Sequence, residues 1–337
     1  MVVLALVTSC DLMAKKIPPV TEEQWSLVNS ENRKITERFL NQLQLSPDTL
    51  KQYKSAARIF FRWVYEYEDD LSLHKLKPRH ALNYQNYLIS LQLSPNSIKF
   101  KRNVISSLCG YYEVFYGEDY PLFRNIFNKK IPNVSKQAVR EKVPLTKEEY
   151  ELLCSELEKR EEWQMLAFLK FTYSSGCRKS EVHQLLKEVA TYEKAKDKEG
   201  NYKNFYKTHN IRTKGKGIEG NVRKLLFDEG AMSAIKKWLE VRDEDDCPYV
   251  FVNKTKAGDV SQLSKSTFNY WTSSIFSEII GRHMFVHLIR STRATHLVVD
   301  DNKDIKTAQQ VLGHADSSTT ELYVVRDENE MADDAFE

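Results

Sequence analysis

Apolar residues in the first part of the chain recur every three or four positions, which is the spacing of helices that bury one face. Two of these stretches open with the same letters, "LSP", at residues 45–47 and 93–95. Serine is a favoured N-cap, and proline is tolerated at the first helical position because its missing N–H would be unpaired there anyway. We therefore predict an all-α domain over residues 30–127, with helices that begin after Ser46 and Ser94.

The helix that follows Ser46 has two different faces. The apolar face, expected in the core, consists of Leu50, Tyr53, Ala57, Phe60, Phe61 and Val64. The other face carries the cations Lys51, Lys54, Arg58 and Arg62, and the helix after Ser94 adds Lys99, Lys101 and Arg102. Such a stripe is able to follow a phosphate backbone, but it is equally typical of a solvated helix surface.

From residue 145 the pattern becomes mixed. A capping box, Thr146 with Glu149, opens one helix, and "WQMLAFLKFTYSSG" is typical of an apolar second one. Strands are predicted around "YKTHNIRTK", "RKLLF" and "YVFVN", and further helices at about 229–241, 264–281, 287–300 and 304–313. The predicted fold class of residues 145–326 is mainly α with a small β-sheet (α+β).

The remaining segments are interpreted as connections and ends. Residues 128–144 are polar, basic and without apolar periodicity, as expected of a linker. Residues 1–29 are expected to be a flexible extension, and residues 327–337 an acidic tail. "MVVLALVTSC" at the start is similar to a lipoprotein cleavage box but lacks a basic n-region, so we favour an in-frame extension upstream of Met13. Whether residues 1–12 belong to the mature protein stays open.

Composition narrows the class of protein. A chain of 337 residues favours two domains, and 41% hydrophobic with 29% charged residues indicates a soluble protein without a membrane span. The five cysteines are scattered and form no C-x-x-C pair, as expected of reduced thiols in the cytoplasm. Residues 1–140 hold 20 Lys and Arg against 13 Asp and Glu, whereas residues 141–337 hold 30 against 34. The first part is therefore the better candidate for binding a polyanion.

Four short patterns in the second part contain residues of the types that carry chemistry. They are "SSGCRKSEV", in which Glu181 braces Arg178; "TKGKGIEGNVRKLLF", with Lys216, or less readily Lys214, at a hairpin tip; "HLIRSTRATHL", with His287 and Arg290 on one helical face; and "LGHADSSTTELYVV", with His314 and Tyr323. Taken singly, each has an ordinary explanation as an ion pair, a solvated turn or a packing tyrosine.

In this order and spacing, the four patterns together resemble the tyrosine recombinase (phage integrase) family. The resemblance covers all of residues 145–326, which it identifies as a catalytic domain, and residues 30–127 look like the family's all-α, SAM-like core-binding domain. It implies that a tyrosine attacks a DNA phosphodiester, forms a 3′-phosphotyrosyl bond and frees a 5′-hydroxyl. It also implies that the reaction needs no metal and no other cofactor.

The resemblance assigns a role to each candidate: nucleophile for Tyr323, stabilisation of phosphate charge for Arg178 and Arg290, proton acceptor for His287, hydrogen bond to the phosphate for His314, and general acid for Lys216. Arginine suits its role because it stays charged and donates two parallel hydrogen bonds. The hairpin is longer than the usual K-G-x-K-x-R form, which leaves the choice between Lys216 and Lys214 open.

The resemblance also implies partners. We expect a protein of a phage or mobile element that binds double-stranded DNA with inverted half-sites as a homotetramer on two sites, and that is a monomer or weak dimer when free, with no membrane partner. The target sequence depends on side-chain geometry in a groove and cannot be read from the chain. Integration, excision and dimer resolution stay open, as do accessory factors.

Three other functions stay open. A non-catalytic DNA-binding regulator of the same fold would bind DNA without forming a covalent adduct. A type IB topoisomerase or telomere resolvase would share the chemistry but relax or seal strands. A metal-dependent transposase, suggested by "DEDD" at 243–246, would be inhibited by EDTA, although such runs are more often solvated loops.

Overall fold

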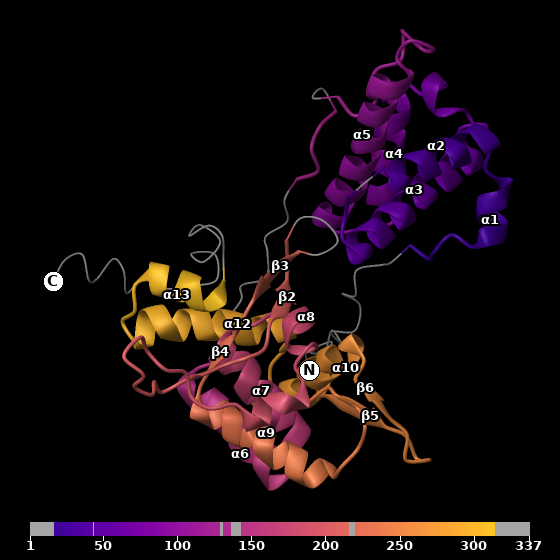
Figure 1. The fold of residues 1–337 in the computed structure, drawn as a ribbon. Helices are drawn as coiled ribbons and strands as arrows, with labels where there is room; N and C mark the ends of the chain where they lie inside the picture. The colour runs from indigo at the N-terminus through magenta and orange to yellow at the C-terminus, as the bar shows by residue number, and fades with distance from the viewer. Residues whose placement is uncertain (1–16, 43, 129–130, 136–142, 216–219, 314–337) are drawn as a thin grey trace, which may run out of the picture. The chain divides into compact units, whose positions relative to one another are not determined.

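The chain divides into two compact units (Figure 1). The computed structural model describes residues 17–42, 44–128, 131–135, 143–215 and 220–313. The first unit contains the described residues up to 135, and the second contains those from 143 onward.

The first unit is helical throughout its described residues. Its helices are α1 (Glu22–Leu27), α2 (Ser30–Asn41), α3 (Pro47–Tyr67), the 3-10 turn η1 (Leu73–Lys75), α4 (Pro78–Ser90) and α5 (Pro95–Tyr116). Ser46 and Ser94 cap α3 and α5 as predicted, each accepting a hydrogen bond from a backbone N–H three residues on. The predicted apolar face of α3 lies in the core, where Phe60 and Phe61 are fully buried.

Part of the expected N-terminal extension belongs to this core. Thr21 and Gln24 form a capping box that starts α1, and Trp25 and Val28 are buried against the first unit's other helices. The expectation of a flexible extension over residues 1–29 is therefore corrected for residues 21–28. The physical reason is the burial of a large indole, which stabilises a helix too short to show apolar periodicity.

The predicted linker also packs at both ends. Ile131 is buried in the core of the first unit, and Val134 packs against that core. At the other end, Arg282 donates hydrogen bonds to the carbonyl oxygens of Val143 (2.9 Å) and Pro144 (2.8 Å). The linker interpreted from the sequence over residues 128–144 thus includes residues at each end that pack against one of the units.

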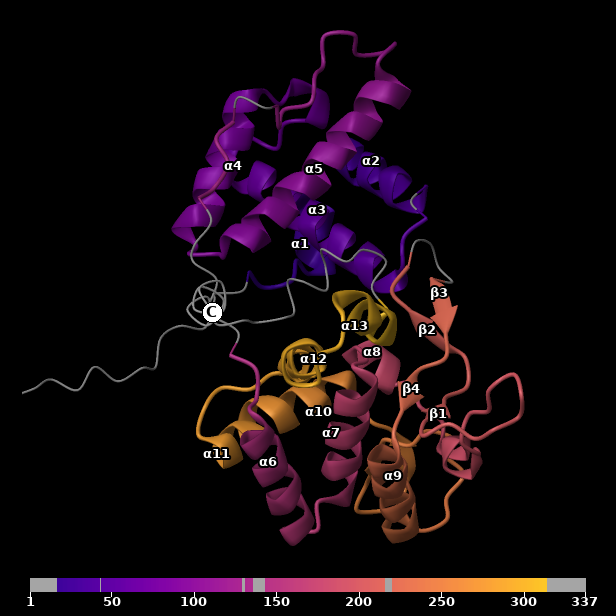
Figure 2. The ribbon, with the colours of Figure 1, turned by 90° about the vertical axis from the view of Figure 1, so that its left-hand side faces the viewer.

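The helices of the second unit surround one apolar helix (Figure 2). They are α6 (Lys147–Lys159), α7 (Trp163–Ser175), α8 (Lys179–Val182), η2 (Lys187–Thr191), α9 (Glu229–Arg242), α10 (Lys265–Tyr270), η3 (Trp271–Phe276), α11 (Ser277–Ile280), α12 (Val286–Thr295), η4 (His296–Asp300) and α13 (Ile305–Leu312). The central helix α7 contacts α6, α9 and α12, and it buries residues on all sides, as its continuous apolar sequence predicts.

Within the described residues, the strands form three antiparallel pairs. They are β1 (Tyr206–Lys207) with β4 (Leu226–Phe227), β2 (Ile211–Thr213) with β3 (Asn221–Arg223), and β5 (Val252–Lys254) with β6 (Val260–Gln262). The predicted hairpin around "TKGKGIEGNVRK" corresponds to β2 and β3, whose register pairs Ile211 with Arg223. The sequence did not predict β6, a three-residue strand in a polar segment.

Candidate active site

The candidate site begins at the end of α7. Gly176 ends this helix at φ 57°, a left-handed conformation that glycine adopts without strain. A Cβ atom at Gly176 would collide with the Leu312 side chain, so the glycine also lets the end of α13 approach closely. The chain then turns into α8 and places Arg178 at the start of that helix.

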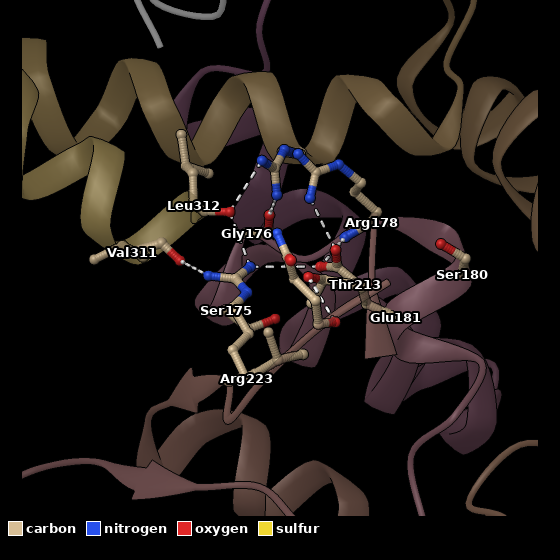
Figure 3. Close-up of polar contacts among 12 residues, drawn as sticks. Ser175, Gly176, Arg178, Ser180, Glu181, Thr213, Arg223, Val311 and Leu312 are labelled. Carbon is tan, nitrogen blue, oxygen red and sulfur yellow. Dashed lines mark hydrogen bonds and ion pairs between the residues drawn. The ribbon is translucent and has the colours of Figure 1, made fainter. Parts of the chain in front are cut away.

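Arg178 is held by a buried carboxylate (Figure 3). Glu181 Oε2 accepts a hydrogen bond from the backbone N–H of Arg178 (3.0 Å), and Oε1 accepts one from its Nη1 (2.9 Å). The Glu181 side chain is fully buried, whereas that of Arg178 keeps 21% of its surface exposed. As predicted, Glu181 braces both the helix start and the guanidinium, which leaves part of Arg178 available to a ligand.

Arg290 reaches the same corner from α12, although it lies 114 positions after Gly176. The side chain is fully buried, and its Nη1 donates to the carbonyl oxygen of Gly176. Its Nη2 donates to the carbonyl oxygen of Leu312 at 3.0 Å. Because a buried guanidinium needs hydrogen-bond acceptors, these two carbonyls fix Arg290 beside the turn that carries Arg178.

A third arginine, which the sequence did not predict as a site residue, completes this corner. Arg223 on β3 donates from Nη1 to the Val311 carbonyl oxygen (3.2 Å) and from Nη2 to that of Leu312 (2.8 Å). The same Nη2 lies 3.4 Å from Glu181 Oε2. No pattern in the residues around Arg223 marks it as a site residue, because its carbonyl partners lie 88 and 89 positions further along the chain.

The charges of this corner do not cancel. Among the described residues of this corner, Arg178, Arg223 and Arg290 contribute three positive charges against the carboxylate of Glu181, an imbalance that suits an anion such as phosphate. Cys177 lies in the same turn, and burial, followed by the negative charge of Glu181, raises the pKa of its thiol to about 12. The thiol is therefore protonated at neutral pH and unsuited to act as a nucleophile.

The other predicted catalytic residues are placed only in part. His287 is exposed in the first turn of α12, three residues before the buried Arg290. Lys214 is exposed directly after β2. Lys216, His314 and Tyr323 lie outside the described residues.

A sequence model of the phage integrase family matches residues 143–330, which is more than half of the chain and includes this corner. The chain belongs to the phage integrase family. The match, together with the order of the four patterns, confirms the family expected from the sequence.

Known recombinases resemble this phage integrase family member over nearly its whole length. The SPbeta prophage-derived recombinase-like protein YomM of Bacillus subtilis is 30% identical over 328 residues, which cover 96% of each chain. The tyrosine recombinase XerD of Rickettsia conorii is 26% identical over 310 residues, covering 85% of this chain and 91% of that protein. These similarities confirm the recombinase class of the enzyme.

A solved structure shares the fold. The XerH site-specific recombinase, crystallised with palindromic difH substrate as a post-cleavage complex, matches with a TM-score of 0.65 at 17% sequence identity. The match covers 94% of this chain and 98% of that chain. It confirms the predicted fold class, a mainly α catalytic domain with a small β-sheet (α+β) that follows an all-α domain.

The predicted phosphate contacts in the first unit of this integrase family member fall into two groups. Lys51, Lys54 and Lys99 are exposed. Arg58 instead forms a bidentate ion pair with Glu22 (2.6 and 3.0 Å) and lies over the Trp25 ring.

Of the remaining three cations, two are bonded within the first unit and one is half-buried. Arg62 pairs with Glu66 at 2.7 Å, and Arg102 donates to Gln85 and to the Pro132 carbonyl oxygen. Lys101 is half-buried, which lowers the pKa of its amine. Of the seven predicted contacts, the three exposed lysines are thus the ones best placed to meet a phosphate backbone.

Two other sequence features have a structural outcome in this family member. In the "DEDD" run, Asp245 forms an ion pair with the buried Arg242, which explains one of its four acids. Within the described residues, no cluster of three or more His, Cys, Asp or Glu is arranged to hold a metal ion. No helix found there is long and apolar enough to cross a membrane.

Proposed function

We propose that this recombinase cuts and rejoins double-stranded DNA at specific sites through a 3′-phosphotyrosyl intermediate, with Tyr323 as the nucleophile. One observation carries the proposal: Arg178 and Arg290, from distant parts of the chain, meet at the Gly176 turn. Two forked cations held at one corner are what a phosphoryl-transfer transition state requires, because its non-bridging oxygens gain negative charge.

Arg178 and Arg290 have different roles because their side chains differ in exposure. The partly exposed Arg178 donates directly to the phosphate, and Glu181 keeps its guanidinium in place. Arg290 is preorganised by the carbonyls of Gly176 and Leu312, so little reorganisation is needed when charge develops. A lysine at either position would lack the planar fork that binds two oxygens at once.

The proton transfers complete the step. Tyr323 Oη forms a bond to phosphorus while the bond from phosphorus to the 5′-oxygen breaks. The phenol proton passes to His287, and Lys216, or alternatively Lys214, donates a proton to the leaving 5′-oxygen. His314 donates a hydrogen bond to the phosphate. The phosphotyrosyl bond retains the energy of the broken bond, so the free 5′-hydroxyl is able to reverse the reaction on a partner strand.

The DNA partner is supported by relatives and by charge. The XerH structure was solved with its difH substrate, and Lys51, Lys54 and Lys99 supply exposed cations on the first unit of this chain. We infer inverted half-sites, a homotetramer on two DNA sites and a role in a phage or mobile element. The similarity to the prophage-derived YomM supports the last of these.

A covalent trapping experiment tests the proposal. Wild-type protein and the variants Tyr323→Phe and Tyr270→Phe are incubated with fragmented host DNA in EDTA, denatured, and the DNA that stays attached is sequenced. Tyr270 is a matched control because it is an exposed tyrosine in the second unit. We expect adducts with wild type and Tyr270→Phe, all at one sequence, and none with Tyr323→Phe.

Each other result points to a different function. Reversible binding of a shared sequence without adducts from any variant favours the regulator. A protein that forms adducts and relaxes supercoiled DNA without exchanging strands favours the topoisomerase. Adducts that form without EDTA and disappear in its presence favour metal-dependent chemistry. Adducts that persist in Tyr323→Phe assign the nucleophile to another residue.

A further inference from the structure

Two arginines donate hydrogen bonds to the C-terminal end of α13. The carbonyl oxygen of Leu312 accepts hydrogen bonds from Arg223 Nη2 (2.8 Å) and from Arg290 Nη2 (3.0 Å), and that of Val311 accepts one from Arg223 Nη1 (3.2 Å). The next residue, Gly313, ends the helix at φ 67°, and His314 follows it directly. The last described helix before the chain segment with His314 and Tyr323 is therefore fixed at its C-terminal end.

These hydrogen bonds have an electrostatic consequence. The final carbonyls of a helix carry partial negative charge, which would repel a phosphate that approaches Arg178 and Arg290. The positive charge of Arg223 lies against those carbonyls and offsets their partial negative charge. Its Nη1 has the Val311 carbonyl as a partner, and its Nη2 has two acceptors within the protein, the Leu312 carbonyl and Glu181 Oε2.

Arg223 also joins three pieces of the site. It lies on β3, where its pairing with Ile211 fixes it to the hairpin that carries Lys214. Its Nη2 lies 3.4 Å from Glu181, the carboxylate that holds Arg178. Through the carbonyls of α13 it reaches 89 positions further along the chain.

Gly313 provides a second, independent observation. A Cβ atom built at this position would collide with the Arg223 guanidinium. The guanidinium thus occupies the space that a side chain at position 313 would need, so the helix end and the arginine fit each other closely.

We propose that Arg223 is a positioning residue that sets the end of α13, and with it the start of the segment carrying His314 and Tyr323, relative to Arg178 and Arg290. This inference rests on the function proposed above. Arg223 acts through backbone carbonyls and contacts neither the phosphate nor the leaving group. Its loss is expected to slow attack by the tyrosine and to leave DNA affinity unchanged.

The first test is independent of activity. Hydrogen–deuterium exchange of residues 305–313 is compared in DNA-free wild type, Arg223→Met and the matched charge-loss control Lys224→Met, whose lysine is exposed next to Arg223. We expect exchange in Arg223→Met to be faster by roughly 10-fold, the factor that corresponds to the loss of a charged hydrogen bond. Lys224→Met is expected to match wild type. Equal exchange in all three proteins overturns the proposal.

The second test separates attack from departure of the leaving group. The substrate is a duplex with the sequence recovered by trapping, made with either oxygen or sulfur as the bridging 5′ atom of the scissile phosphate. Sulfur leaves without protonation because a thiol is far more acidic than an alcohol. Adduct formation by Arg223→Met is expected to fall about 10- to 100-fold on both substrates, the range in which a misplaced reacting group slows catalysis.

Controls keep the outcomes distinct. Lys216→Ala is expected to be rescued by the sulfur substrate, and Arg223→Lys to recover part of the lost rate. Gly313→Ala displaces the guanidinium without removing it and is expected to reproduce the slow attack, also if Arg223→Met fails to fold. Rescue of Arg223→Met by sulfur, or a parallel loss of DNA affinity, overturns the proposal. Absence of adducts with wild type contradicts the proposed function instead.

Discussion

At the scale of single residues, Glu181 offsets part of the positive charge of the site. It is fully buried and accepts hydrogen bonds from the Arg178 backbone, the Arg178 guanidinium and Arg223. Without its charge, two arginines that are each about four-fifths buried would lack their carboxylate partner. Both the stability of the second unit and the orientation of the Arg178 guanidinium therefore depend on the Glu181 side chain.

We expect Glu181→Gln to lower the free energy of unfolding by about 1–3 kcal/mol, because a buried charged pair is reduced to neutral hydrogen bonds. Urea unfolding followed by circular dichroism measures the change. Glu240→Gln is the control, since Glu240 pairs with Lys237 at the surface and should matter by less than about 0.5 kcal/mol. Equal effects of the two variants would contradict the role given to Glu181.

Arg290→Lys is expected to slow adduct formation by about 10²–10³-fold, the loss typical of removing one preorganised donor from a transition state. A lysine cannot donate to the Gly176 and Leu312 carbonyls and still present a fork to the phosphate. Arg293→Lys, one turn further along α12 and 3.8 Å from Asp301, is the matched control. The rate of trapping on the recovered DNA site distinguishes them, and a similar loss in both would argue against a specific role of Arg290.

The sequence predicted some of these residues and missed others for a physical reason. Arg178, Glu181, His287 and Arg290 stand in short patterns whose local spacing carries information. Arg223 binds backbone carbonyls 88 and 89 positions away, and such contacts leave no mark in the residues around either partner.

At the scale of elements, the periodic helices were predicted, including the eight-residue α13, whereas the short elements α1 and β6 were not. α3 and α5 have both a capping signal and enough turns to show an apolar face. α1 has six residues, so its one usable signal was the Thr21 to Gln24 capping box. The strand β6 has three residues and gains its conformation from pairing with β5, which no local pattern encodes.

The element α1 offers a direct test. We expect Trp25→Ala to destabilise the first unit by about 3–5 kcal/mol, the usual cost of deleting a buried aromatic side chain. Leu27→Ala lies on the same helix but at a side chain that is 58% exposed, and a change under about 0.5 kcal/mol is expected. Thermal unfolding of the full chain compares them. If the Trp25→Ala protein is as stable as Leu27→Ala, residues 21–28 do not contribute to the core of the first unit.

The start of α6 yields a pH-dependent prediction. The Arg282 guanidinium, which donates to Glu149, lowers the pKa of that carboxyl below its usual 4.5. A depressed folded-state pKa stabilises the protein above the unfolded value, and this stabilisation declines as pH falls from 4.5 toward the folded value. Glu149→Gln should therefore cost about 1 kcal/mol at pH 7 and clearly less at pH 4.

Unfolding by urea at the two pH values measures this difference for Glu149→Gln. Glu158→Gln, on the exposed side of the same helix, should change stability by less than about 0.5 kcal/mol at both. A penalty for Glu149→Gln that stays constant between pH 7 and pH 4 would show that the ion pair is not its source.

At the scale of the whole molecule, the fold class and the family followed from the sequence, and the two units match the division read from its patterns only in outline. The predicted DNA face on α3 illustrates the limit, since half of its cations, Arg58 and Arg62, are paired within the first unit. Periodicity shows which residues share a helical face. It does not show which of them a neighbouring helix has already engaged.

This division of cations predicts the salt dependence of DNA binding. Replacing Lys51, Lys54 and Lys99 together by glutamine should reduce the slope of log affinity against log salt by about 2 to 3, close to one unit for each phosphate that is no longer neutralised. Arg58→Gln should leave the slope unchanged because its guanidinium is bound to Glu22. Fluorescence anisotropy over a range of KCl concentrations gives both slopes, and an equal reduction by Arg58→Gln would place that arginine on the DNA.

The exclusion between the Arg223 guanidinium and a side chain at position 313 also constrains how the chain can change over generations. A lineage that first replaces Gly313 expels the guanidinium and strains a left-handed backbone, whereas one that first loses Arg223 opens space beside the helix end. The order of the two substitutions is therefore not neutral. Among homologous chains, we expect side chains larger than glycine at position 313 chiefly where position 223 has already ceased to be arginine.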